Sequence, residues 1–279
     1  MKTALSGIMF ENQSIADAVK AAGEAGYDGL ELRTNERHLP ATTTPEKART
    51  LRRQIEGYGM HVSCIASFVG EGAGGDQDKW AAHFEDFKRF TELAHELDCD
   101  LVRVILGGPA SAVATEADWV QPVIWLKKIE SFAAANGVYA VIEIHNGDLV
   151  DDVDSGIKIT HEVGGQHLGL IYEPANMHIC GKSYGAEAVK ALAERILHVH
   201  VKDVVLHAPK EVGSQPPFEI VPLGKGEMDY LSVFRGLHEI DYNGYVCVEL
   251  AHGPHIPMPP VYLAKRELMA VKYLMDLTR

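Results

Sequence analysis

The sequence lacks the features of secreted, membrane-spanning and zinc-ribbon proteins. No apolar run reaches the ~20 residues of a membrane helix, and the first residues contain no signal-peptide core. No two cysteines have CxxC spacing, which favours reduced thiols over a disulfide framework. We therefore expect a cytoplasmic protein with no membrane partner. The four cysteines are Cys64, Cys99, Cys180 and Cys247.

Basic residues are also scarce. The sequence has 26 Lys and Arg residues and 39 Asp and Glu residues, so its formal net charge is −13 over 279 residues. A surface of this sign repels phosphate backbones, so we expect no nucleic-acid partner. The glycines of residues 70–75 do not open a helix in the GxGxxG register. Since no arginine cluster stands out either, an unphosphorylated substrate is favoured.

Strand-like and helix-like segments alternate along the whole chain. Ser14 and Gly26 bound one helix, Thr44 and Pro45 begin the next, and Gly137 ends a later one. The expected strands are 3–9, 27–33, 60–68, 100–108, 138–146, 167–174, 196–203 and 245–250. The expected helices are 15–26, 44–59, 77–98, 117–136, 152–163, 184–194, 229–239 and 261–277, with a loop of about 25 residues after 203. Eight such pairs predict an α/β protein with one (β/α)₈ TIM barrel over residues 1–279.

Function in such a barrel lies at the carboxyl ends of the strands. Unusual polar residues lie at the ends of the last four expected strands: Glu143, Glu173, His200 and Glu249. Three carboxylates buried together would repel one another unless a cation neutralised them. We therefore predict one divalent metal ion held by these four residues. The oxygen-rich set favours Mn²⁺, with Mg²⁺, Co²⁺, Zn²⁺ and Fe²⁺ as alternatives.

The motifs around these residues carry a family resemblance. They are E-x-H at residues 143–145, Y-E-P-A-N at 172–176, H-V-H-V-K-D at 198–203, G-K-G-E-M-D at 224–229 and V-E-L at 248–250. Together they resemble the xylose isomerase-like TIM barrels of the sugar phosphate isomerase/epimerase superfamily, across nearly the whole chain. The resemblance implies the same four metal ligands, with Glu173 where the family usually has Asp. It also implies that Glu143 and Glu249 form the acid/base pair.

The predicted reaction is isomerisation or epimerisation of a small keto sugar or keto-cyclitol. A metal ion would stabilise the enediolate formed when a proton leaves the carbon beside the carbonyl. His145, Asn176, Lys202 and Arg33 are expected to bind the substrate. A dimer or tetramer is also expected, because related barrels often pair.

Inward-facing residues beside this set are expected to have structural roles. His198 lies one step deeper than His200 and is expected in the core. Glu31 shares a strand face with Arg33, and Arg103 is expected to pair with Glu31 inside the barrel.

Three other functions compete with this prediction. A lyase that eliminates water from a keto sugar or keto-cyclitol begins with the same proton removal, so the sequence does not separate it from an isomerase. A DNA-repair endonuclease of the superfamily would need more metal ligands on the third and fourth strands and a basic groove. A sugar-binding protein without activity would have no need of the Glu143 and Glu249 pair.

Overall fold

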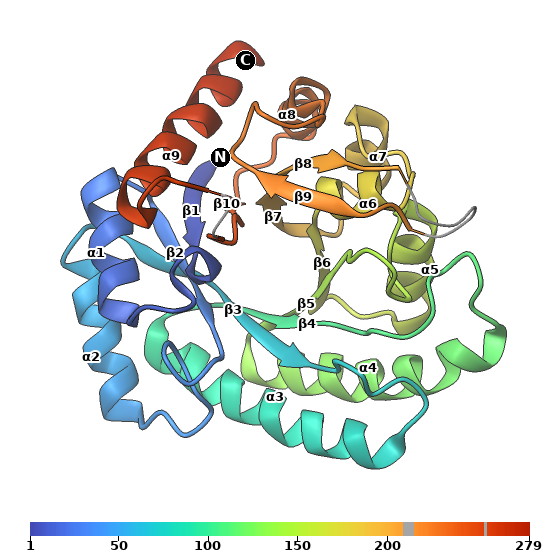
Figure 1. The fold of residues 1–279 in the computed structure, drawn as a ribbon. Coiled ribbons are helices and arrows are strands. Elements are labelled where there is room, and N and C mark those ends of the chain that lie inside the picture. Colours follow the sequence, from blue (N-terminus) through green and yellow to red (C-terminus); the bar gives the residue numbers. More distant parts are fainter. Residues whose placement is uncertain (209–214, 254–255) are drawn as a thin grey trace.

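A closed barrel of parallel strands forms the centre of the molecule (Figure 1). The computed structural model describes residues 1–208, 215–253 and 256–279. The barrel order is β1-β10-β7-β6-β5-β4-β3-β2, and every neighbouring pair is parallel. The predicted (β/α)₈ class is thereby confirmed. The barrel strands are β1 Lys2–Ser6, β2 Gly29–Arg33, β3 His61–Val69, β4 Leu101–Val104, β5 Tyr139–Glu143, β6 Leu168–Tyr172, β7 Ile196–Val201 and β10 Tyr245–Val248.

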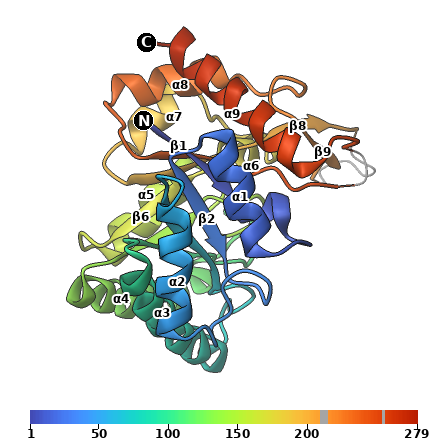
Figure 2. The same ribbon diagram turned by 90° about the vertical axis from the view of Figure 1, so that its left-hand side faces the viewer.

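Helices form a ring outside these strands. The final helix packs against the first, which closes the ring (Figure 2). None of the helices in the described ranges is long and apolar enough to cross a membrane. The helices are η1 Gly7–Phe10, α1 Ile15–Ala25, α2 Pro45–Glu56, α3 Gln77–Leu97, α4 Glu116–Asn136, α5 Val153–Val163, α6 Pro174–Ile179, α7 Ala186–Ala191, α8 Tyr230–Glu239 and α9 Pro260–Leu277.

The capping residues expected from the sequence begin and end these helices. Ser14 forms a capping box with Asp17 at the start of α1, and the Thr44 side chain accepts a hydrogen bond at the start of α2. Gly26 and Gly137 end α1 and α4 with positive φ angles of 93° and 66°. Local chemistry therefore sets these boundaries, which fixes how each helix meets the barrel.

Apolar side chains fill both the space under the helices and the interior of the barrel. The larger cluster joins the outer faces of the strands to the helices. A small cluster of Cys64, Val141 and Ile171 lies apart from it, and Val141 is two residues before Glu143 on β5. Since alternate strand residues share a face, this small cluster lies beneath the polar residues at the carboxyl end. It keeps water out from below.

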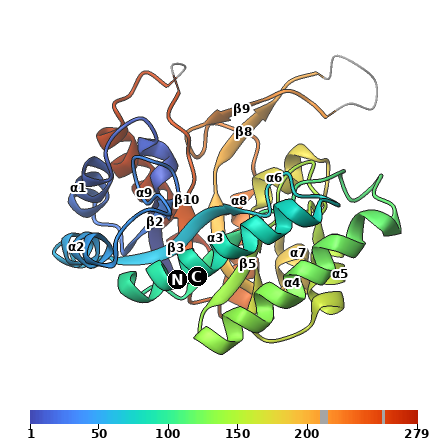
Figure 3. The same ribbon diagram turned by 90° about the horizontal axis from the view of Figure 1, so that it is seen from below.

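The segment after β7 contains a hairpin where the sequence predicted a loop. Strands β8 Asp203–Leu206 and β9 Phe218–Val221 pair antiparallel outside the barrel. Figure 3 shows this hairpin rising above one end of the barrel. Each strand has only four residues, too few for a clear alternation of apolar and polar positions. Part of the expected loop, 209–214, lies outside the described residues.

A short helix also differs from the expected pattern. Strand β6 ends at Tyr172, and Glu173 caps α6, because its side chain accepts a hydrogen bond from the Ala175 N–H at 2.9 Å. The sequence placed Glu173 as the last strand residue. The cap explains the difference, since Pro174 cannot donate to a sheet and favours the first position of a helix.

Asp203 organises the chain below the hairpin. Its buried carboxylate accepts four backbone hydrogen bonds, from Val204 at 3.0 Å, Gly224 at 2.8 Å, Gly226 at 2.9 Å and Met228 at 3.2 Å. Gly226 has no room for a side chain, because a Cβ would overlap Asp203. Asp203 therefore fixes the segment that joins the hairpin to α8.

We predict that Asp203→Asn lowers the free energy of unfolding by about 2–3 kcal/mol, because the amide nitrogen would face backbone donors that now bind a carboxylate. Urea denaturation measures the difference. Asp229→Asn is the matched control. Asp229 caps α8 by accepting from the Ser232 N–H, and Asn caps equally well. Equal losses in the two variants would contradict the role given to Asp203.

Candidate functional site

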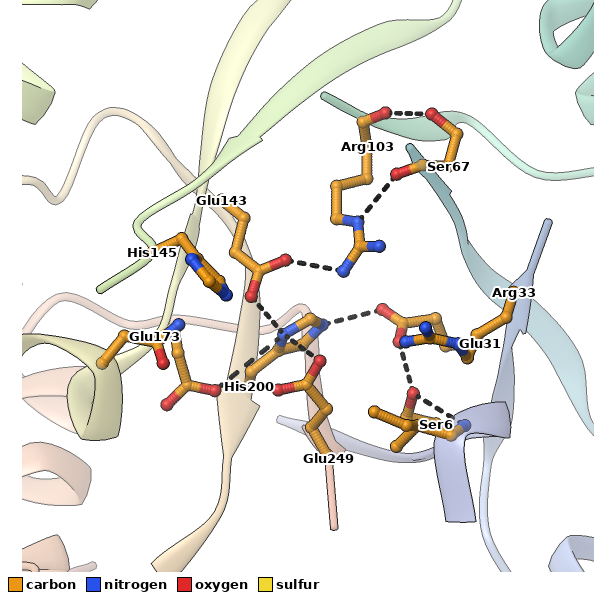
Figure 4. A network of polar contacts seen from close by, with 12 residues as sticks. Ser6, Glu31, Arg33, Ser67, Arg103, Glu143, His145, Glu173, His200 and Glu249 are labelled. Carbon is orange, nitrogen blue, oxygen red and sulfur yellow. Dashed lines mark hydrogen bonds and ion pairs between the residues drawn. The ribbon is translucent and has the colours of Figure 1, made fainter. Parts of the chain in front are cut away.

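Charged and polar side chains fill the carboxyl end of the barrel interior (Figure 4). They come from strands β2, β4 and β7 and from the residues at or just after the ends of β5, β6, β7 and β10. All of the following residues are at most 9% exposed: Glu31 and Arg33 on β2, Arg103 on β4, Glu143 on β5, Glu173 after β6, His198 and His200 on β7, Lys202 after β7 and Glu249 after β10. The structure thus brings the four predicted metal ligands into one buried cluster.

His200 lies at the centre of this cluster. Its Nδ1 atom is 3.6 Å from Glu249 Oε1, 3.8 Å from Glu143 Oε1 and 4.0 Å from Glu173 Oε2. No residue in the described ranges makes a hydrogen bond to this Nδ1 or to Glu173 Oε2. Four potential ligands thus face a common space, and two of them have buried atoms that still lack a partner.

The other nitrogen of His200 is held by Glu31. His200 Nε2 lies 2.8 Å from Glu31 Oε2, and His198 Nε2 lies 3.3 Å from the same oxygen. Ser6 donates to Glu31 Oε1 at 2.7 Å. Burial by itself raises the pKa of Glu31, but the two imidazoles outweigh it and hold this pKa well below its usual value. Burial lowers the pKa of His200, but Glu31 and Glu249 raise it well above its usual value, so Nδ1 carries a proton that a metal ion would displace. The ionised Glu31 keeps the other proton on Nε2 and so orients Nδ1 toward the metal position.

Glu143 is paired with Arg103, a contact that corrects one expectation. Arg103 was predicted to pair with Glu31, but its Nη1 donates to Glu143 Oε2 at 2.6 Å and its Nε donates to the Ser67 carbonyl at 3.1 Å. Glu31 is already occupied by the two histidines and Ser6. Burial raises the pKa of Glu143, yet Arg103 and His200 lower it well below its usual value. Glu143 is therefore held ionised.

Lys202 lies between the remaining two carboxylates. Its Nζ donates to Glu249 Oε2 at 2.8 Å and is 3.5 Å from Glu173 Oε2. Burial and the nearby Glu249 raise the pKa of Glu173 to about 7, although Lys202 opposes the shift. Burial lowers the pKa of Lys202, but Glu173 and Glu249 more than reverse this, so the ammonium stays charged.

These atoms suit a divalent cation. The ligand atoms of Glu143, His200 and Glu249 all lie within 4.8 Å of one another, and Glu173 Oε2 faces the same imidazole nitrogen. A second group of possible ligand atoms, also within 4.8 Å of one another, comes from Glu31, His198, His200 and Cys247. It is less suitable, because hydrogen bonds already engage both oxygens of Glu31 and burial raises the pKa of the Cys247 thiol well above its usual value.

The predicted substrate-binding residues lie around a cavity above this cluster. His145, Asn176, Lys202 and Arg33 line it together with Glu143 and Glu249, and its volume is about 380 Å³. The Asn176 amide donates to the Ile144 carbonyl at 3.1 Å, and its side-chain oxygen is buried without a partner in the described structure. His145 Nδ1 lies 3.4 Å from Asp148 Oδ2. The volume suits a small-molecule substrate.

Two contacts of the site were missed from the sequence, those of Glu31 with the histidines and of Arg103 with Glu143. A signal for both was present. Each residue is a charge within a short, mostly apolar strand: Glu31 in GLELR at 29–33, which also contains Arg33, and Arg103 in LVRV at 101–104. Such charges need buried partners, but strand spacing does not say which ones.

Comparison with known proteins gives both a family and curated relatives. The family model of the xylose isomerase-like TIM barrel matches residues 19–273. An inosose dehydratase of Clostridium perfringens is 26% identical over 200 residues, which span 67% of this chain and 64% of that protein. An inosose dehydratase of Yersinia enterocolitica is 25% identical over 267 residues, which span 86% and 84%. The chain thus spans just under two thirds of the first relative and most of the second.

Solved structures resemble this chain over its full length. The IOLI protein with a bound zinc atom has a TM-score of 0.83 at 18% identity and covers 100% of this chain and 99% of its own. An L-ribulose 3-epimerase has a TM-score of 0.81 at 19% identity, with 100% and 95% covered. A probable 3-DHS dehydratase of Bacillus anthracis has a TM-score of 0.79 at 19% identity, with 98% and 99% covered. These likenesses establish the fold, and together with the family match they show that this chain belongs to the xylose isomerase-like TIM barrel family.

Proposed function

We propose that this protein is a divalent-metal-dependent lyase that removes water from a keto-cyclitol or a related small keto sugar. The single observation that carries the proposal is the unequal pairing of two carboxylates. Glu143 is held ionised by Arg103, whereas Glu249 is paired with Lys202, which also reaches Glu173. The name of the curated relatives, inosose dehydratase, supports the same reaction class.

Glu143, Glu173, His200 and Glu249 are the proposed metal ligands. Manganese is the ion that we expect first, because three carboxylates and one imidazole form an oxygen-rich set; Mg²⁺, Co²⁺, Zn²⁺ and Fe²⁺ remain alternatives. When bound, the ion supplies Lewis-acid polarisation of the substrate carbonyl. The zinc atom of the IOLI structure supports a divalent ion without identifying it.

Elimination needs one base and one donor to the leaving group. We propose that Glu249 accepts the proton from the carbon beside the carbonyl, as its C–H bond breaks. As the C–O bond breaks, Lys202 Nζ gives a proton to the departing hydroxyl, which leaves as water, and the proton on Glu249 then passes to Lys202 Nζ, 2.8 Å away. The new C=C bond is conjugated with the carbonyl. Protonation of Glu143 would leave the Arg103 guanidinium without its carboxylate, whereas protonation of Glu249 leaves Lys202 with Glu173 at 3.5 Å, so Glu143 flanks the substrate without carrying a proton.

The second candidate is an isomerase or epimerase. It is favoured by the two carboxylates, Glu143 and Glu249, that lie on either side of His200 Nδ1 at 3.8 and 3.6 Å. Epimerisation needs proton transfer on two faces, so Glu143 would have to accept or return a proton. The ion pair with Arg103 opposes that step.

The metal proposal predicts a specific effect of Glu31. Glu31→Gln should weaken binding of Mn²⁺ by about 10- to 100-fold, because His200 loses the carboxylate that orients its imidazole. Titration of the chelator-stripped protein with Mn²⁺ measures this. Glu36→Gln, an exposed change of the same kind on the following loop, should leave the affinity unchanged. A wild-type protein that bound no divalent ion would end the metal proposal.

The reaction is tested with an inosose and with ketohexoses in D₂O. We expect the Mn²⁺-loaded protein to convert the inosose to a product that has lost water and absorbs as a conjugated enone, seen by NMR and absorbance. Glu249→Gln should slow this by about 10²–10⁴-fold, the usual contribution of a general base. Glu219→Gln, an exposed glutamate of β9, is the matched control. A deuterated epimer without loss of water would favour the isomerase instead.

A further inference from the structure

Two buried arginines flank one aromatic ring in the cavity above the metal ligands. Arg33 and Arg103 are 9% and 2% exposed, and their Cζ atoms lie 5.0 and 5.4 Å from the centre of the Phe68 ring. All three residues line the cavity. Figure 4 shows both guanidinium groups pointing toward the centre of the site. The arginines come from β2 and β4, which β3 separates in the barrel, so no short-range pattern indicates that they meet.

Both guanidinium groups retain donors without partners. Arg103 Nη1 donates to Glu143 and Arg103 Nε donates to the Ser67 carbonyl. Its Nη2 has no hydrogen-bond partner among the residues described. Arg33 Nε is likewise unpartnered, and the ion pair of Arg33 is a 3.4 Å contact with the half-exposed Glu11. A buried N–H of a charged group that binds nothing is costly. These donors can therefore bind an acceptor that none of the described residues supplies.

The pairing of the buried charges predicts the sign of that acceptor. Glu31 is held by the two histidines and Ser6, Glu143 by Arg103, and Glu173 and Glu249 by Lys202. Among the described residues none of these carboxylates pairs with Arg33, and Arg103 Nη2 makes no hydrogen bond. Two guanidinium groups with unused donors beside one ring favour a negatively charged acceptor.

We infer that the substrate carries a carboxylate, and that Arg33 and Arg103 bind it beside Phe68. The inference rests on the proposed function and narrows it to a keto acid with a hydroxylated ring or short chain. The carboxylate would lie toward Phe68, with the carbonyl toward His200. A planar carboxylate matches the fork of a guanidinium and neutralises one charge, whereas a phosphate brings nearly two. A cavity of about 380 Å³ accommodates a six-membered ring with one such group.

The test compares two ring polyols that differ in a carboxylate. Quinate and myo-inositol are titrated into the Mn²⁺-loaded protein by calorimetry. We expect quinate to bind at least about tenfold more tightly, and Arg33→Gln to remove that advantage without weakening myo-inositol. Arg33→Lys should retain part of it, because the charge stays but the fork is lost. Arg37→Gln is the matched control, since it removes the same charge from an exposed position on the loop that follows β2.

Three outcomes would overturn the inference. The first is quinate that binds no more tightly than myo-inositol. The second is an equal loss of quinate binding in Arg33→Gln and Arg37→Gln. The third is myo-inositol 1-phosphate that binds more tightly than quinate. Since binding is measured without turnover, it is independent of the reaction test. If the protein binds quinate through Arg33 but dehydrates no ketone, the carboxylate site is supported and the proposed lyase activity is rejected.

Discussion

The gathering of four carboxylates in a space closed to water is the constraint on which the rest of this site depends. Glu31, Glu143, Glu173 and Glu249 are all at most 6% exposed. Like charges at such distances in a medium of low dielectric constant are tolerated only if each has a partner. Arg103, Lys202 and the two histidines serve that need, and the partners differ from one carboxylate to the next.

The differences between these partners give the carboxylates different chemistry. Glu31 is saturated by hydrogen bonds and orients an imidazole. Glu143 is fixed as an anion by a guanidinium that does not release its proton at ordinary pH. Glu249 shares a lysine with Glu173, and that ammonium can reach either oxygen. Three glutamates of the same site thus have three roles. Glu31 orients an imidazole, Glu143 is a fixed negative charge, and Glu249 can accept a proton.

The barrel makes this arrangement rigid. The functional residues lie in or directly after barrel strands, and each of these strands is hydrogen-bonded to a strand on either side. The small apolar cluster of Cys64, Val141 and Ile171 fills the interior beneath them. The hairpin of β8 and β9 extends from the same end, and its residues Phe218 and Ile220 line the cavity. One fold can serve many substrates, so substrate choice is expected to depend on residues such as these and the two arginines.

The sequence by itself determined the repeating strand–helix pattern, the helix caps and the strand ends at which Glu143, Glu173, His200 and Glu249 lie. These are local properties, set by periodicity and by capping chemistry within a few residues. The pairing of Arg103 with Glu143, the contact of Glu31 with His200 and the meeting of Arg33 with Arg103 at Phe68 were decided only by the tertiary structure. Each contact joins residues that are between 35 and 169 positions apart in the sequence. Their strands pair in registers that no short-range pattern specifies, and the register shifts at Leu30/Glu31 and at Leu170/Ile171. Partner choice among buried charges depends on distances across the barrel, and those exist only once it is closed.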